Sequence, residues 1–187
     1  PELESCIVAW DFQETIHSRS YTHIVKNVYA DPAEVFDTIL DDEQIIARAE
    51  SVSAEYDKFH KIVTDYMYKG KGSMYEVKKQ LYKAMMTVNI LEGLRFYVSF
   101  ACTFAFGELK KMEGSAKIIS LIARDEATHL NISTHILKHW AQGDDDPAFV
   151  KIAKECKEEP YELWRTCVEE EKKWADYLFE KGSIVGL

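Results

Sequence analysis

The sequence contains few of the residues that interrupt helices, because only four prolines and eight glycines occur among its 187 residues. A fold made of many short strands and tight turns would need more of both, so this scarcity favours long helices. Cysteine is also scarce: the four cysteines lie far apart and include no CxxC pair. A disulfide framework would be denser, and we therefore expect reduced thiols in a cytoplasmic protein.

Positive charge is in deficit as well, since 23 Lys and Arg stand against 32 Asp and Glu, a formal net charge of −9. Nucleic acids and anionic membranes both select for Lys and Arg, so neither is expected as a partner. Apolar runs are short, and none approaches the roughly 20 residues that a membrane-spanning helix needs.

The chain does contain a succession of long helical patterns with short connections. The patterns predict helices over residues 3–29, 43–68, 74–111, 115–141, 147–157 and 160–181, with a further short segment at 31–40. Ser73 and Glu76 are spaced as a capping box in front of the helix that starts at residue 74. Long helices joined by short connections predict a helical bundle, and we expect one domain over residues 1–187.

Two ExxH pairs are the most informative motifs. Glu14 and His17 form the first pair, and Glu126 and His129 form the second, each on a long predicted helix. A spacing of three residues places both side chains of a pair on the same helix face. One such pair occurs often by chance, whereas two in one bundle indicate a metal site.

Glu92 supplies a third element of that site. Ferritin-like bundles hold two metal ions with one carboxylate from each of two helices and an ExxH pair from each of two others. Such ligands suit a pair of iron or manganese ions, and the ligand types alone do not separate the two metals. Glu92 is a lone acid in an apolar stretch and would be costly to bury unpaired. The alternative partner for its carboxylate is nearby Arg95.

The two halves of the site predict a missing member. Glu92 precedes Glu126 by 34 residues. If the same repeat holds for the first ExxH pair, its carboxylate helix would lie upstream of residue 1. The chain therefore offers five ligands (Glu14, His17, Glu92, Glu126 and His129), and a sixth is expected outside it.

A tyrosine lies on the same helix face as the first ExxH pair. Trp10, Glu14, His17 and Tyr21 succeed one another at spacings of four, three and four, so they form one stripe. Tyr21 could be an ordinary core residue or a redox group beside the metals. Three apolar side chains near the other ligands would wall off such a site: Phe96, Phe100 and Ile122. The remaining histidines are expected to be solvated or partly buried and not to be ligands: His23, His60, His135 and His139.

Three stretches of the chain closely resemble the small subunit of class I ribonucleotide reductase. They are ETIHSRSYTH at 14–23, LEGLRFYVSFACTFAF at 91–106 and AKIISLIARDEATHL at 116–130. The ending EKKWADYLFEKGSIVGL is similar to the bacterial and phage members, so the resemblance covers essentially the whole chain. It implies an all-α, ferritin-like helical bundle with a dinuclear metal site.

The resemblance also implies a role for each candidate residue. The five ligands named above match metal ligands of the family, and Tyr21 matches the tyrosine that is oxidised to a stable radical. Phe96, Phe100 and Ile122 match the apolar pocket around that radical. Asp125 matches an acid that accepts a hydrogen bond from His17, and Trp10 matches a residue near Glu92.

The implied function is that of a ribonucleoside-diphosphate reductase small subunit. A di-iron site reacts with O2 to form a tyrosyl radical, which starts ribonucleotide reduction in a separate large subunit for deoxyribonucleotide synthesis. A homodimer is also expected. The family's upstream ligand, upstream tryptophan and C-terminal docking tail have no counterpart here, so we interpret the domain as incomplete at both ends.

Three alternatives stay open at this point. A ferroxidase or iron-storage bundle would share the ligand recipe. A helical fragment could bind metal, or keep the ligands as relics, without activity of its own. A carboxylate-bridged hydroxylase or desaturase would also use such a site.

Overall fold

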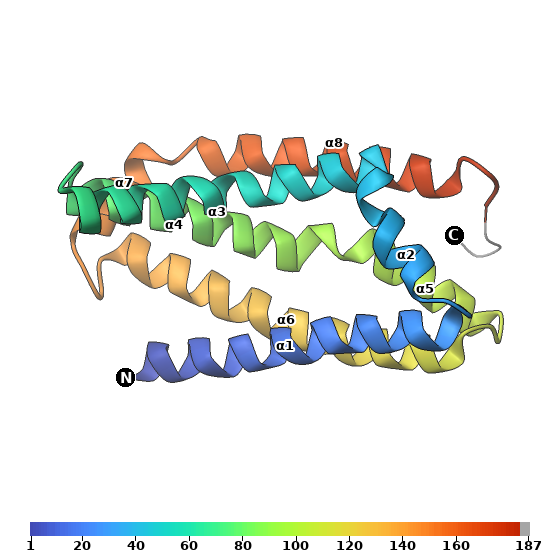
Figure 1. Ribbon diagram of the computed structural model, residues 1–187. Coiled ribbons are helices and arrows are strands. Elements are labelled where there is room, and N and C mark those ends of the chain that lie inside the picture. The colour runs from blue at the N-terminus through green and yellow to red at the C-terminus, as the bar shows by residue number, and fades with distance from the viewer. Residues whose placement is uncertain (184–187) are drawn as a thin grey trace.

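The computed structural model describes residues 1–183, and the last four residues of the motif that ends the chain lie outside this range. Within it, all regular elements are helices (Figure 1). The long ones are α1 (Glu2–Val28), α3 (Glu43–Lys69), α6 (Glu113–Gln142) and α8 (Glu159–Phe179). The short ones are α2 (Ala33–Thr38), the 3-10 helix η1 (Ile39–Asp41) and α7 (Ala148–Glu155). The predicted all-α, ferritin-like bundle is confirmed.

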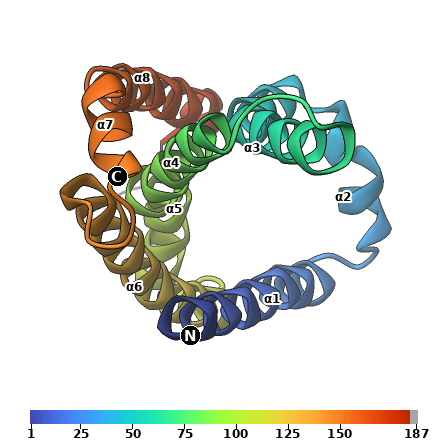
Figure 2. The ribbon, with the colours of Figure 1, turned by 90° about the vertical axis from the view of Figure 1, so that its left-hand side faces the viewer.

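A nearly continuous helical run forms the centre of the bundle. It consists of α4 (Met74–Ile90), the π-helix η2 (Leu91–Arg95) and α5 (Tyr97–Glu108). This run packs against α3 and α8 on one side and against α6 on the other. Helix α1 lies at the edge, beside α6 (Figure 2). The site helices α1, η2 and α6 are therefore neighbours in space although they are far apart in sequence.

The central run differs from the single α-helix predicted over residues 74–111. The capping box of Ser73 and Glu76 is present and starts the helix as expected. The prediction was wrong about the second half of the run, because the π-helix interrupts it at residues 91–95 and the run ends at Glu108. π-Helical turns insert an extra residue into an α-helix and are frequent at functional sites. Glu92 lies in this turn.

By length and composition alone, the run from Met74 to Glu108 would also qualify as a membrane-crossing helix. The expectation from sequence was that no segment would. In the described bundle, however, the run packs against α3, α6, α7 and α8 and carries two buried charged residues, Glu92 and Arg95. We interpret it as a core helix of the bundle.

Close packing of α5 on α6 depends on a small residue. A Cβ atom placed on Gly107 would lie only 2.8 Å from the Cβ atom of Ala116. Elsewhere between these helices, Phe100, Ile119 and Ile122 form a buried apolar cluster. A second buried cluster involves α6 and α7, where Trp140 stacks on Phe149 with ring centroids 4.5 Å apart.

A buried ionic network joins the π-helix to α8 and α3. The Arg95 guanidinium hydrogen-bonds to Glu170 and lies 3.8 Å from Glu171. Arg48 on α3 donates to Glu171 and to the backbone carbonyl of Arg95. The C-terminal end of η2, just beyond Glu92, is thus held by charged groups from two other helices.

Candidate metal centre

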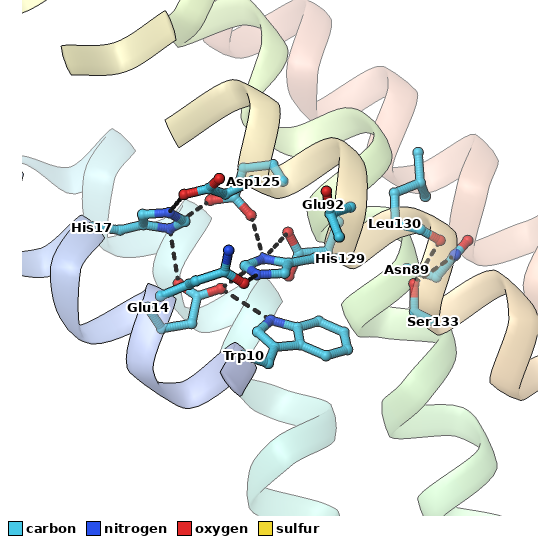
Figure 3. A network of polar contacts seen from close by, with 12 residues as sticks. Trp10, Glu14, His17, Asn89, Glu92, Asp125, His129, Leu130 and Ser133 are labelled. Carbon is cyan, nitrogen blue, oxygen red and sulfur yellow. Dashed lines mark hydrogen bonds and ion pairs between the residues drawn. The ribbon is translucent and has the colours of Figure 1, made fainter. Parts of the chain in front are cut away.

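Four of the five predicted ligands meet in one cluster. One donor atom from each of Glu14, Glu92, Glu126 and His129 lies within 4.8 Å of the others, and all but Glu14 are buried (Figure 3). The residues come from α1, η2 and α6. Because α6 packs against both α1 and η2, the four side chains meet although they are far apart in sequence. Three carboxylates and an imidazole form a donor set suited to iron or manganese.

His17, the fifth predicted ligand, lies directly beside this cluster. Its Nδ1 atom is 3.1 Å from a Glu126 oxygen and 3.4 Å from a Glu14 oxygen. That nitrogen is buried and has no hydrogen-bond partner among the described residues. On the other side of the ring, Nε2 lies 3.2 Å from Asp125, the acid expected to orient it (Figure 3). The imidazole therefore presents Nδ1 to the carboxylates and is held in that orientation from outside.

His129 is arranged in the same way but with a different outer partner. Its Nδ1 atom is 3.0 Å from Glu126 and 3.3 Å from Glu14. Its Nε2 atom donates to the side-chain oxygen of Gln13 at 3.0 Å. Sequence reasoning missed Gln13, and its position next to Glu14 was the only available signal. The two histidines thus differ in their supports, a carboxylate for His17 and a neutral amide for His129.

Glu92 is buried, but within residues 1–183 one of its carboxyl oxygens lacks the hydrogen bond that would normally offset the cost of burial. It is 2% exposed, and its Oε2 atom has no hydrogen-bond partner in the described part of the chain. Burial raises the pKa of its carboxyl to about 8, and the neighbouring charge of Glu126 acts in the same direction. The alternative pairing with Arg95 is wrong, since Arg95 turns to Glu170 and Glu171 instead.

The charge balance of the cluster supports a cation. Although burial lowers it, the nearby carboxylates of Glu126, Glu14 and Glu92 raise the pKa of His129 to about 11. A hydrogen bond from His129 lowers the pKa of Glu14. Protons on His129 and Glu92 therefore offset the carboxylate charge, while the two buried atoms named above find no partner within residues 1–183. Bound cations would replace those protons and satisfy both atoms, so these residues fit a metal pair.

Trp10 contacts the site through Glu14 and His129. Its indole N–H donates to Glu14 at 3.2 Å, and its ring stacks on His129 with centroids 4.8 Å apart. The expectation that Trp10 also lies near Glu92 stays a prediction. The i to i+4 spacing within α1 explains the observed contact, because it places Trp10 one turn before Glu14 on the same face.

Tyr21 lies on the same side of α1 but remains 45% exposed. The pKa of its phenol is raised to about 12, first by burial and then by the charges of Glu126 and Glu14. The hydroxyl end is therefore influenced by the carboxylates although one side of the residue is open. Phe100 and Ile122 share the buried apolar cluster, and Phe96 packs against it. The α1 residue that packs on this cluster is Ile24, which lies one turn beyond Tyr21.

A second tyrosine also responds to the carboxylates. Burial raises the pKa of Tyr56 on α3 to about 12, and the charges of Glu92 and Glu14 act in the same direction. Sequence reasoning did not identify Tyr56, because nothing in the spacing of α3 relates it to either ExxH pair. Two phenols on different helices are therefore influenced by the candidate centre.

Comparison with known proteins gives one consistent result. A family model described as "Ribonucleotide reductase, small chain" matches residues 1–187. The ribonucleoside-diphosphate reductase subunit beta of Haemophilus influenzae is 52% identical over 198 aligned residues, which cover 100% of this chain and 53% of that protein. The corresponding proteins of Escherichia coli O157:H7 and Enterobacteria phage T4 are 50% and 41% identical, again over 100% of this chain and 53% of theirs. The chain thus spans about half the length of the curated relatives it matches.

Proposed function

This chain belongs to the ribonucleotide reductase small-chain family, and on that premise we propose that it forms the metal centre of a ribonucleoside-diphosphate reductase small subunit. Its role would be to generate a tyrosyl radical that starts ribonucleotide reduction in a large subunit. The observation that carries the proposal is the convergence of the two ExxH pairs and Glu92 around buried polar atoms that lack partners in the described chain.

The five donors would divide between two metal ions. Both histidines turn Nδ1 toward the carboxylates, so each ExxH pair offers one imidazole and one carboxylate. Glu14 is the most open member, with 44% of its side chain exposed. A sixth carboxylate from outside these residues would enter on that side and complete the set.

When bound, two iron ions, or manganese in their place, would supply the one-electron oxidising power that arises from reaction with O2. The chain's own part is to control protons and water around that chemistry. Tyr21 keeps its phenolic proton at neutral pH, because its pKa is raised to about 12. Its oxidation must therefore release the proton from Oη together with the electron. Glu126 and Glu14 are the anionic groups whose charges act on this phenol.

The apolar cluster of Phe96, Phe100 and Ile122 would help to protect the tyrosyl radical. Phe100 and Ile122 are buried, and Phe96 packs against them. A phenoxyl radical is quenched by water and reductants, so an apolar wall on one side extends its lifetime. Asp125 would hold His17 in the tautomer that presents Nδ1 to a metal.

Partners and compartment are proposed on the same premise. We propose the reductase large subunit and a second copy of the small subunit as partners. Helix α1 exposes Val8 and Phe12, each at 65%, an apolar surface of the kind that another protein buries. All four cysteines are free thiols, which suits a cytoplasmic protein.

The decisive experiment is metal loading followed by electron paramagnetic resonance. Protein stripped with a chelator is given Fe2+ without oxygen and then exposed to O2. We expect about two iron ions per chain and a tyrosyl signal that is absent in Tyr21→Phe. Tyr56→Phe is the matched control, because the same kind of carboxylate charge acts on Tyr56 and its removal should leave the signal unchanged.

Each other outcome has a defined meaning. A signal lost in Tyr56→Phe and kept in Tyr21→Phe would move the radical to α3. Iron uptake far above two ions per chain would favour a ferroxidase or storage protein. Absence of iron binding by the chelator-stripped protein would contradict the proposal altogether.

A further inference from the structure

A second group of metal-binding side chains lies away from the carboxylate cluster. A hollow of about 550 Å³ opens between the first turns of α1 and the C-terminal half of α6. His135 and His139 both line it, together with Cys6 and Asp145. None of these residues belongs to the Glu14, Glu92, Glu126 and His129 cluster. The hollow therefore offers nitrogen and sulfur donors at a place that the proposed function does not use.

The two histidines are spaced to act together. Residues four apart on a helix share one face, and the rings of His135 and His139 have centroids 4.1 Å apart. Two histidines at this spacing on one helix are the arrangement that holds zinc in the HExxH motif. The sequence analysis expected both to be solvated or partly buried and not to be ligands, and His135 is indeed exposed and His139 partly buried. The partner that distinguishes His139 comes from the loop after α6.

That partner is Asp144. Its carboxylate lies 2.5 Å from Nδ1 of His139. A carboxylate on one ring nitrogen fixes the tautomer, so the other nitrogen, Nε2, is left as a metal donor. The turn that positions Asp144 is set by Gly143, whose φ of 83° ends α6 in the left-handed conformation. The orientation of His139 is thus determined by the end of the helix and not by its sequence spacing.

We propose that His135 and His139 form a two-histidine binding site for a borderline divalent cation such as Zn2+, with Asp144 orienting His139. Among the described residues no third His, Cys, Asp or Glu donor gathers within 4.8 Å of both histidines, so water would complete the shell. Imidazole donors favour Zn2+, Cu2+ or Ni2+, whereas carboxylate-rich sites suit iron and manganese better. Helix α6 would then carry two metal sites of different preference, one centred on His129 and one on His135. The inference does not depend on the proposed radical chemistry.

Zinc titration tests this directly. Chelator-treated protein is titrated with Zn2+ in competition with a chromophoric zinc indicator, which reports both stoichiometry and affinity. We expect His135→Asn and His139→Asn each to bind one equivalent less than the unmodified protein. Asp144→Asn should retain the site but weaken it by about 10- to 100-fold, the usual loss when an outer carboxylate is removed.

Two controls separate this site from other zinc binding. Glu126→Gln disrupts the carboxylate cluster and should leave the His135-dependent equivalent intact. His60→Asn removes an exposed histidine on α3, outside the hollow, and should change nothing. An identical titration for the unmodified protein and both His135→Asn and His139→Asn would overturn the proposal, and so would an equal loss in His60→Asn.

A readout without variants guards against folding defects. Bound Zn2+ should protect His135 and His139 from acylation by diethyl pyrocarbonate, measured residue by residue by mass spectrometry. His23 is exposed and far along α1, so its modification should not change. Equal modification of all three histidines with and without Zn2+ would contradict the site.

Discussion

Replacing Glu92 by glutamine should stabilise the metal-free protein while weakening its metal binding. Glu92 is 2% exposed, and one of its oxygens has no partner among residues 1–183. Burial raises its pKa from 4.5 to about 8. The folded chain must therefore keep a proton that the unfolded chain gives up. Glutamine has nearly the same shape and needs no proton.

The size of the effect depends on this pKa difference. In the unfolded chain the carboxyl has its ordinary pKa, and pH 7 lies about 2.5 units above it. Each unit corresponds to about 1.4 kcal/mol of free energy. Keeping Glu92 protonated thus costs about 3 kcal/mol of folding stability. Glutamine alters the contact with the His129 imidazole, which lies 3.7 Å from Glu92, at a cost of about 1 kcal/mol. A net gain of about 2 kcal/mol at pH 7 is expected from these two contributions.

The sign of the pH dependence is also determined. Because the folded pKa of Glu92 is the higher one, its contribution to stability is fully present below pH 4.5 and is lost as the pH rises to about 8. The raised pKa of His129 acts in the same direction, with stability lost as the pH rises from 6.5 toward 11. Metal binding needs deprotonated ligands, so metal should stabilise the protein increasingly over the same range.

Urea unfolding between pH 5 and pH 8, with a chelator present, measures both effects. The unmodified protein should lose stability as the pH rises, and Glu92→Gln should show a smaller slope. Glu171→Gln is the matched control: Glu171 is also buried, at 4% exposure, but it is paired with Arg48 and Arg95. Removing one partner of a buried pair costs about 3 kcal/mol or more, so this variant should be destabilised. A destabilised Glu92→Gln at pH 7 would refute the reasoning.

Three further predictions concern single contacts. Gln13→Ala should weaken metal binding about 10- to 100-fold, because it removes the hydrogen-bond partner of the His129 Nε2 atom. The tautomer of His129 can be followed by 15N chemical shifts, and unchanged affinity and shifts would contradict this role of Gln13. Gly107→Ala should destabilise the fold by about 1 kcal/mol or more in thermal unfolding, because its Cβ atom would lie 2.8 Å from that of Ala116. Gly114→Ala is the control: its new Cβ atom would meet no described atom within 4 Å, so this variant should be stabilised by about 0.5–1 kcal/mol. Equal changes in the unfolding temperature of the two glycine variants would argue against the close approach of α5 and α6.

Local spacing was enough to predict much of this protein. Three-residue spacing fixes two side chains on one helix face whatever surrounds the helix, so both ExxH pairs could be identified from sequence. The capping box of Ser73 and Glu76 is local in the same sense and starts α4 as expected. The scarcity of proline and glycine correctly indicated long helices, and the motifs correctly indicated the family.

Contacts between distant segments decided the rest. The hydrogen bond from His129 to Gln13 spans 116 residues, and the pairing of Arg95 with Glu170 spans 75, so no helical period encodes either. The π-helix around Glu92 is stabilised by groups from α3 and α8 that meet it only in the bundle. Pairing of His139 with Asp144 joins residues only five apart, but it depends on the left-handed turn after α6, which the helical spacing does not encode. The exposure of Tyr21 likewise depends on what packs over α1, because a helix sets the direction of a side chain but only its neighbours set its burial.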